Sequence, residues 1–291
     1  MALDSMQEIF DTAEAGGREF WEVVLDTDME ERSVTAEASM EKMRIAWRAM
    51  LEAVDTYRGD RLSASGLVGG DGKKMRNYAA EMNTLSGPYL SAVIASALCT
   101  GESNACMRRI VAAPTAGASG VLPAVLIPLY HRGDIDEDAA VRGLYVAAGI
   151  GAVVGSRACI SGASGGCQAE IGTASAMAAG TLTALRGGSC QQIGHAVAMA
   201  LKNLLGLVCD PVAGLVEVPC VKRNVVGAVN AVSCADMALA GVESRVPVDQ
   251  VIDCMGAVGR KMSEEFRETA LGGLADSPFG REVKERMKNR V

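Results

Sequence analysis

The sequence is short of several residue types and patterns that would place a protein quickly. Aromatic residues make up 4% of the 291 residues, and histidine occurs twice. No alternation of apolar and polar residues persists, so a half-buried β-sheet is not expected. No stretch matches GxxxxGK[ST], which argues against a standard nucleotide loop, and no nucleophile elbow is expected. Two histidines also give little support to a zinc or iron site built on imidazoles.

Positive charge is also in short supply. The chain has 28 Lys and Arg against 35 Asp and Glu, a formal net charge of -7. We therefore expect no nucleic-acid partner, because no basic patch is available to neutralise phosphates. The N-terminal stretch lacks the basic region and apolar run of a signal peptide. The longest apolar run, residues 143–156, is too short to span a bilayer. These features predict a soluble cytoplasmic protein without a membrane-spanning segment.

Small residues and sulfur are abundant instead, with 33 Gly, 15 Met and 9 Cys. A core with few large rings favours helices that cross at short distance, and apolar residues recur at helical spacing along the chain. We predict an all-α single domain over residues 1–291, with small-residue-rich helices packed around one or two very apolar central helices. Residues 1–60 are expected to form peripheral helices, and residues 61–291 to carry the binding core.

Local signals predict the elements on either side of this core. Residues 65–75, SGLVGGDGKKM, contain four glycines and are predicted to form a flexible loop. Such a loop can offer N–H groups and an ammonium to an anion, although a solvated linker has the same composition. Residues 85–100 and 102–112 are predicted to form two helices. A capping box at Ser189 predicts a helix over residues 190–207.

The cysteines fall into two groups. Nine is an odd number in a chain without an export signal, so a disulfide framework is not expected. Most of the cysteines suit a buried core, but three lie at the edges of turns, where rigid thiolates could hold an iron–sulfur cluster. These three are Cys167, Cys209 and Cys220. They are separated by 41 and by 10 residues, a spacing that matches no general motif.

Longer stretches around these cysteines are more specific. Along the chain from residue 65 to residue 278 these stretches are SGLVGGDGKK, IVAAPTAGASGVLPAVL, GGCQAEIG, CDPVAGLVEVPCVKRN and ETALGGLADSP. With these stretches, in the same order as in that family, the chain resembles the alpha chain of the iron–sulfur-dependent L-serine dehydratases. The resemblance implies that Cys167, Cys209 and Cys220 hold a [4Fe-4S] cluster with one iron not ligated by protein. It also implies deamination of L-serine to pyruvate and ammonia, without pyridoxal phosphate.

Candidate substrate contacts lie in the glycine-rich stretches. Thr115, Gly117 and Ser119 come just before a predicted helix, where free N–H groups and the helix dipole suit a carboxylate. A plain capping loop would use the same residues. Lys73 and Arg223 are further candidates for binding the substrate anion.

One lysine is a candidate for the catalytic base. Lys202 lies near the cluster segments, and burial could lower its pKa enough for it to take a proton. The alternative is an ordinary lysine whose stem packs on apolar surface. His195 is seven residues earlier and is expected to share its direction, but we interpret His195 as a core histidine.

Two features of the resemblance bear on partners and regulation. Some family members carry an N-terminal beta domain, which this chain lacks, so we expect a separate beta chain and an oligomer. Some members end in a cysteine that ligates the fourth iron in the resting state. Here the last cysteine is Cys254, so a resting state blocked by a C-terminal cysteine is not expected.

Two other functions remain open. A related lyase could act on L-cysteine or another β-substituted amino acid, because one or two contacts to the leaving group would decide this. A non-catalytic, cysteine-rich helical subunit would use its thiols only as core.

Overall fold

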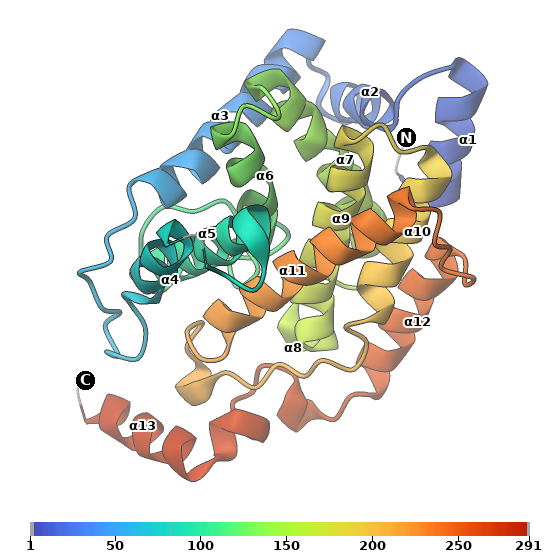
Figure 1. Ribbon diagram of the computed structural model, residues 1–291. Coiled ribbons are helices and arrows are strands. Elements are labelled where there is room, and N and C mark those ends of the chain that lie inside the picture. The colour runs from blue at the N-terminus through green and yellow to red at the C-terminus, as the bar shows by residue number, and fades with distance from the viewer. Residues whose placement is uncertain (1–2, 82, 290–291) are drawn as a thin grey trace.

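The structure is a computed structural model that describes residues 3–81 and 83–289. Within these residues the chain is 69% helical and contains 13 α-helices and no strand. The prediction of an all-α fold is confirmed. Figure 1 shows α1 to α3, in blue, along one edge of the molecule and α13, in red, along the opposite edge.

The helices before the candidate site are α1 (Met6–Gly16), α2 (Phe20–Arg32), α3 (Ala36–Asp55), α4 (Asp71–Ala80), α5 (Gly87–Ala105), α6 (Val121–His131) and α7 (Glu137–Arg157). The site region and the C-terminal part contain α8 (Gly162–Gly165), the π-helix η1 (Gln168–Gly172), α9 (Thr173–Leu185), α10 (Cys190–Lys202), the 3-10 helix η2 (Val212–Gly214), α11 (Cys220–Leu239), α12 (Val248–Lys261), the 3-10 helices η3 (Glu264–Phe266) and η4 (Gly273–Asp276), and α13 (Pro278–Lys288).

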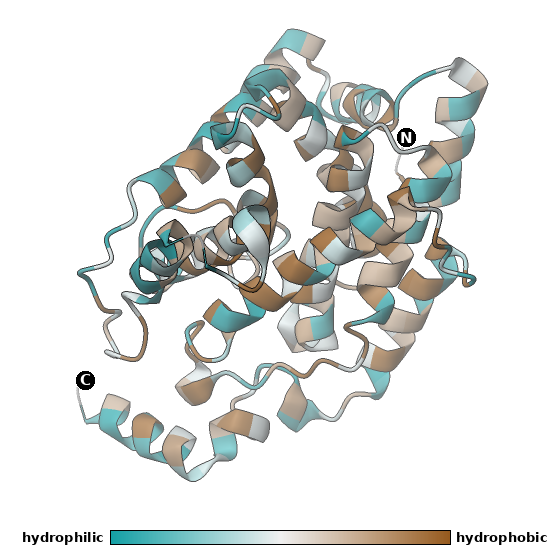
Figure 2. Cartoon of the chain, in the orientation of Figure 1, coloured by the Kyte–Doolittle hydropathy of each residue, from teal (hydrophilic) through white to brown (hydrophobic). Residues whose placement is uncertain are grey.

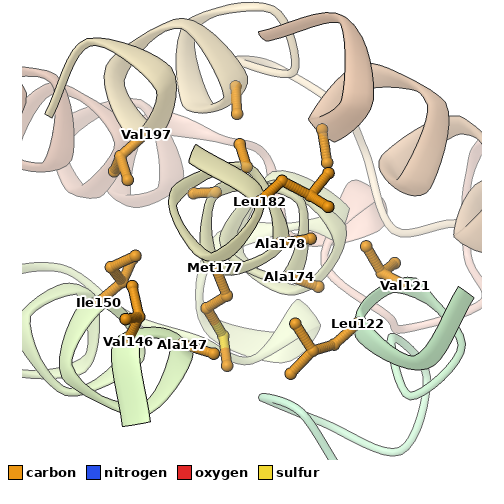
Figure 3. Packing of buried hydrophobic residues seen from close by; sticks show 14 of the residues in the cluster. Val121, Leu122, Val146, Ala147, Ile150, Ala174, Met177, Ala178, Leu182 and Val197 are labelled. Atoms are coloured by element: carbon orange, nitrogen blue, oxygen red, sulfur yellow. The ribbon is translucent and has the colours of Figure 1, made fainter. Parts of the chain in front are cut away.

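Two apolar helices, α6 and α9, lie at the centre. Nine of the eleven residues of α6 and eleven of the thirteen of α9 are buried. Helix α9 packs against α6, α7, α10 and α11. Figure 3 shows Met177 and Leu182 of α9 among side chains of these neighbours, including Val121, Ile150 and Val197. The prediction of one or two very apolar central helices is therefore confirmed, with two present.

Small residues allow these helices to approach closely. A Cβ atom on Gly143 of α7 would lie 2.9 Å from Cγ2 of Thr181 on α9. A larger residue at position 143 would therefore push the two helices apart, which a densely packed interior does not tolerate well. The shortage of aromatic residues and the abundance of glycine both allow the helices to pack at short distance.

Helices α1 to α3 form an outer layer. Its hydrophilic residues are coloured teal in Figure 2, whereas the central helices are mostly pale or brown. Helices α2 and α3 pack on α7, and buried apolar residues such as Phe20, Trp47 and Met50 join the layer to the main core. Gly17 ends α1 with a φ of 59°, where glycine is unstrained.

Helix α7 is the one described helix that is long and apolar enough to cross a membrane. Of its most apolar stretch, 61% is buried inside the protein, against α2, α3 and α9 among others. Burial of this kind is typical of a core helix. The helix extends beyond the apolar run of residues 143–156, so the length of that run underestimated the length of the helix.

Three predicted boundaries were wrong. Residues from Asp71 onward are helical rather than part of a loop, because Glu102 accepts hydrogen bonds from the backbone N–H groups of Asp71 (2.9 Å) and Gly72 (3.2 Å) and so caps α4. The two helices predicted over residues 85–112 are one helix, α5, which ends before Met107 adopts a φ of 58°. Helix α10 ends at Lys202 rather than near residue 207.

Candidate metal and substrate site

The three predicted cluster cysteines line one cavity of about 150 Å³. They come from the start of η1, the loop after α10 and the first residue of α11. The complete lining is Thr115, Ala116, Gly117, Cys167, Glu170, Ile171, Cys209, Pro211, Val216, Cys220 and Glu268. The structure thus brings together Cys167, Cys209 and Cys220 with Thr115 and Gly117, from segments far apart in the sequence.

Cys167 is held through its neighbour Gln168. The Gln168 backbone N–H donates to the carbonyl of Leu207 at 2.9 Å. Its side-chain amide donates to the carbonyl of Met255 at 3.2 Å and accepts from the N–H of Gly206 at 2.9 Å. The buried amide therefore joins η1 to α12 and to the chain that leads toward Cys209.

Cys209 is held through its backbone. Its N–H donates to the carbonyl of Phe266, and its carbonyl accepts from the N–H of Glu268, both at 2.8 Å. Glu268 has a φ of 62°, a conformation that non-glycine residues seldom adopt unless their surroundings impose it. The same pairing that holds Cys209 thus brings Glu268 to the cavity.

A buried ion pair follows Cys209. Asp210 is 3% exposed, and it accepts hydrogen bonds from Nη2 of Arg223 and from the N–H of Leu274, both at 2.8 Å. Arg223 also donates through Nη1 to the carbonyl of Val208 at 2.8 Å. Arg223 was predicted to bind substrate, but the structure places its guanidinium on the Cys209 segment and outside the cavity lining.

Cys220 is connected to the loop before α6 by one buried side chain. Nδ2 of Asn224 donates to the carbonyl of Cys220 at 2.9 Å and to that of Gly117 at 2.7 Å. Oδ1 of Asn224 accepts from the N–H of Gly120 at 2.8 Å.

The three thiols differ in acidity. The pKa of Cys167 is lowered, first by its interaction with the Cys209 thiol and also because Arg223 is close, although burial opposes this. The same interaction raises the pKa of Cys209, whose thiol lies 3.9 Å from Oε2 of Glu170. Burial raises the pKa of Cys220 to about 12. A metal bound by all three thiolates would therefore have to displace protons from Cys209 and Cys220.

Two carboxylates complete the site, and sequence reasoning missed both. Burial raises the pKa of Glu170, the Thr115 hydroxyl opposes this, and the charge of Glu268 adds to the rise. A Cβ on Gly162 would lie 2.8 Å from Sγ of Cys209, 2.9 Å from Oε2 of Glu170 and 3.0 Å from Oε2 of Glu268. A glycine is therefore needed where these three groups converge. The available signal was that both acids lie inside the GGCQAEIG and ETALGGLADSP stretches.

Two hydroxyls predicted to bind substrate are buried and poorly satisfied. Among the described residues, neither Oγ1 of Thr115 nor Oγ of Ser119 makes a hydrogen bond of normal geometry, although Thr115 faces Glu170 closely enough to affect its pKa. Buried hydroxyls usually have a partner. Both belong to the loop that precedes α6, as predicted, but only Thr115 lines the cavity.

The two predicted lysines lie away from the cavity. Nζ of Lys202 donates to the carbonyl of Ser244 at 2.6 Å, and Nδ1 of His195 accepts from the N–H of the same residue. These two side chains do share a direction, but that direction is toward the loop at residue 244. Lys73 is an exposed residue of α4, packed near Gly59. Neither lysine belongs to the cavity lining.

The arrangement of the thiols is not that of a site for a single metal ion. In residues 3–81 and 83–289, no group of three or more His, Cys, Asp or Glu side chains is arranged to hold one metal ion. An iron–sulfur cluster distributes its thiolate ligands over several irons, as three thiols around a shared cavity would allow. The cavity contains no fourth cysteine.

Comparison with known proteins gives a consistent result. The family model described as "Serine dehydratase alpha chain" matches residues 15–275. A chain from Bacillus subtilis (strain 168), named "Probable L-serine dehydratase, alpha chain", is 45% identical over 266 residues, which are 91% of this chain and 89% of the relative. The "L-serine dehydratase, alpha chain" of Peptoniphilus asaccharolyticus is 40% identical over 283 residues, 97% of each chain. The "L-serine dehydratase TdcG" of Escherichia coli (strain K12) is 46% identical over 183 residues, 62% of this chain but 40% of that protein.

Proposed function

Because this chain belongs to the serine dehydratase alpha chain family, we propose that it is the catalytic alpha chain of an L-serine dehydratase, which converts L-serine to pyruvate and ammonia. The observation that supports this most strongly is the convergence of three thiols, a buried carboxyl and a buried threonine hydroxyl on one cavity. The relatives' names specify L-serine and so favour it over L-cysteine, and a non-catalytic subunit would not need this convergence.

Cys167, Cys209 and Cys220 are the residues that would hold a [4Fe-4S] cluster with one iron not ligated by protein. When bound, such a cluster supplies a Lewis acid that assists departure of the β-hydroxyl of serine. Arg223 supports this set of ligands, because it lies where it stabilises the Cys167 thiolate.

The loop before α6 would bind the substrate carboxylate. Gly117 and Thr115 line the cavity, whereas Ser119, whose buried hydroxyl also has no partner among the described residues, lies in the same loop outside the lining. The loop leads directly into the N-terminus of α6, where the helix dipole favours an anion. A carboxylate in the cavity could accept from the Thr115 hydroxyl, which makes no hydrogen bond of normal geometry among the described residues.

Glu170 is the side chain best placed to take the Cα proton. Its carboxyl lines the cavity, and burial raises its pKa toward the range in which a carboxylate is an effective base. Removal of the proton by a carboxylate oxygen and loss of the β-hydroxyl leave aminoacrylate. Its imine tautomer takes up water to give pyruvate and ammonia. Lys202 would then stabilise the loop at Ser244 instead of acting as the base.

The proposal includes a separate beta chain, an oligomer and a cytoplasmic location. The names of the two relatives that match along nearly their full length identify them as alpha chains, whereas the longer TdcG relative is named as the dehydratase itself. A second component therefore fits the difference in length between these relatives.

The test is anaerobic purification together with the proposed beta chain, followed by iron determination and a pyruvate assay on L-serine, L-threonine and L-cysteine. Alanine replacement of Cys167, Cys209 or Cys220 should abolish iron binding and turnover, whereas the exposed Cys254 serves as the matched control. Faster turnover of L-cysteine would favour the related lyase. Wild-type protein with neither iron nor activity would support the non-catalytic subunit.

A further inference from the structure

The feature that leads beyond the proposed function is the buried side chain of Asn224. It is 2% exposed and lies on α11, one helical turn after Cys220. Its amide makes three hydrogen bonds, all to backbone groups and all between 2.7 and 2.9 Å. A buried amide that uses both donor hydrogens and its acceptor is strongly fixed in orientation.

The partners of this amide belong to two different walls of the cavity. Gly117 and Gly120 lie in the loop before α6, and Cys220 begins α11. Both Gly117 and Cys220 line the cavity, whereas Asn224 does not. Neither the loop nor the cysteine can move relative to the other without breaking a hydrogen bond to Asn224.

The space around this contact is also tight. A Cβ on Gly120 would lie 2.9 Å from Oδ1 of Asn224 and 3.0 Å from the carbonyl oxygen of Ala97. Since one of these neighbours is backbone, a methyl group at position 120 would displace the Asn224 amide. The position of the Asn224 amide therefore depends on the glycine at position 120.

We propose that Asn224 is a positioning residue that fixes the substrate-binding loop at a set distance from the third cluster cysteine. This inference rests on the proposed function for the roles of the loop and of Cys220. Asn224 touches neither substrate nor metal. It acts through Gly117, Gly120 and Cys220, and it sets where the substrate carboxylate lies relative to the metal-binding thiols.

The first test uses Asn224→Asp in the holoenzyme with its beta chain. Aspartate retains the acceptor for Gly120 but loses both donors and places negative charge against two carbonyls. We expect KM for L-serine to rise about tenfold or more, because the substrate-binding loop loses the hydrogen bond that fixes it, with a much smaller change in kcat. Gly120→Ala should shift KM in the same direction, and it provides a second route if Asn224→Asp does not fold.

Asn230→Asp is the matched control. Asn230 lies on the same helix, and its Nδ2 also donates two hydrogen bonds, to Oγ of Ser175 at 2.9 Å and to the carbonyl of Ala200 at 3.0 Å. These partners lie on α9 and α10 rather than on the cavity loop. The control should lower stability and leave KM unchanged.

The second test requires no iron and no activity. In reduced, iron-free chain, alkylation by iodoacetamide is followed at each cysteine by peptide mass mapping, with exposed Cys254 as the internal reference. Asn224→Asp should speed alkylation of Cys220 severalfold. Asn230→Asp should instead change the alkylation rate of Cys234, whose Sγ lies 3.6 Å from Oδ1 of Asn230.

The proposal is overturned if Asn224→Asp changes neither KM nor the alkylation of Cys220, or if Asn230→Asp reproduces both changes. A wild-type enzyme that does not turn over L-serine would refute the proposed function alone. The alkylation comparison would still show whether Asn224 holds the loop against Cys220.

Discussion

The outer layer and the cysteine-lined site are stabilised in different ways. Helices α1 to α3 are amphipathic and bury apolar side chains such as Trp47 against the core, while their ion pairs are exposed. An example is Arg44 with Asp138, whose carboxylate side chain is 66% exposed. Around the cavity, a few buried polar groups hold irregular backbone. Asp210 and Asn224 are examples, and each holds more than one segment.

This difference has consequences for substitutions. Burial of apolar area is non-directional, so the outer layer can absorb changes with a loss of stability alone. A buried polar group without its partner carries the full desolvation penalty and releases the segments that it held. Substitutions in the two regions should therefore separate stability from function.

The largest effect is expected for Asp210→Ala. It leaves the Arg223 guanidinium buried without its carboxylate and frees the N–H of Leu274. Loss of one partner of a buried ion pair costs about 3–5 kcal/mol of the free energy of unfolding, and release of the Cys209 segment should also abolish iron retention. Urea unfolding and iron content measure the two effects. Asp138→Ala is the control, since loss of an exposed pair costs about 0–1 kcal/mol. Equal losses in both variants would contradict the comparison.

A substitution in the outer layer should sharpen the contrast. Met50→Ala removes a buried side chain of α3 and should cost about 2–5 kcal/mol of the free energy of unfolding, because the cavity left behind relaxes only in part. KM for L-serine and iron content at a permissive temperature should remain at wild-type values. A change in KM would show that the layer is coupled to the site.

The difference between the two regions also decides which features the sequence can predict, because the helices depend on local signals and the site depends on contacts between distant segments. Periodic apolar residues and a local capping box at Ser189 correctly predicted helices, because both signals act within a few residues. The start of α4 at Asp71 could not be predicted, since its cap is Glu102, far along the chain. Helical periodicity correctly predicted that Lys202 and His195 point in the same direction. It does not reveal which part of the protein these side chains face. Glu170 is a single acid in an apolar stretch and produces no periodic signal, so only the fold brings it to the thiols.

A smaller effect is expected for Gly162→Ala. The added methyl would lie within 3.0 Å of Cys209, Glu170 and Glu268. Overpacking of this kind costs about 1–3 kcal/mol, and here the strain falls on groups that line the cavity. We expect weaker iron retention and lower kcat with only a modest decrease in stability. Gly155→Ala is the control, since its nearest contact would be Ile160 at an ordinary 3.9 Å. Full iron content and activity in Gly162→Ala would show that the convergence at this glycine is unimportant.

The smallest effect is expected in the pH dependence of stability of the iron-free chain. The pKa of Glu170 is raised in the folded state, chiefly by burial, so between its unfolded and folded pKa values the folded state binds more protons than the unfolded state. The free energy of unfolding must then fall as pH rises through that interval. Glu170→Gln removes this titration, so the variant should gain stability relative to wild type as pH increases from about 4 toward neutrality. Urea midpoints across that range measure the difference. A difference that stays constant with pH would mean that the folded protein does not penalise the Glu170 carboxylate, and burial would then give no reason to regard Glu170 as a suitable base.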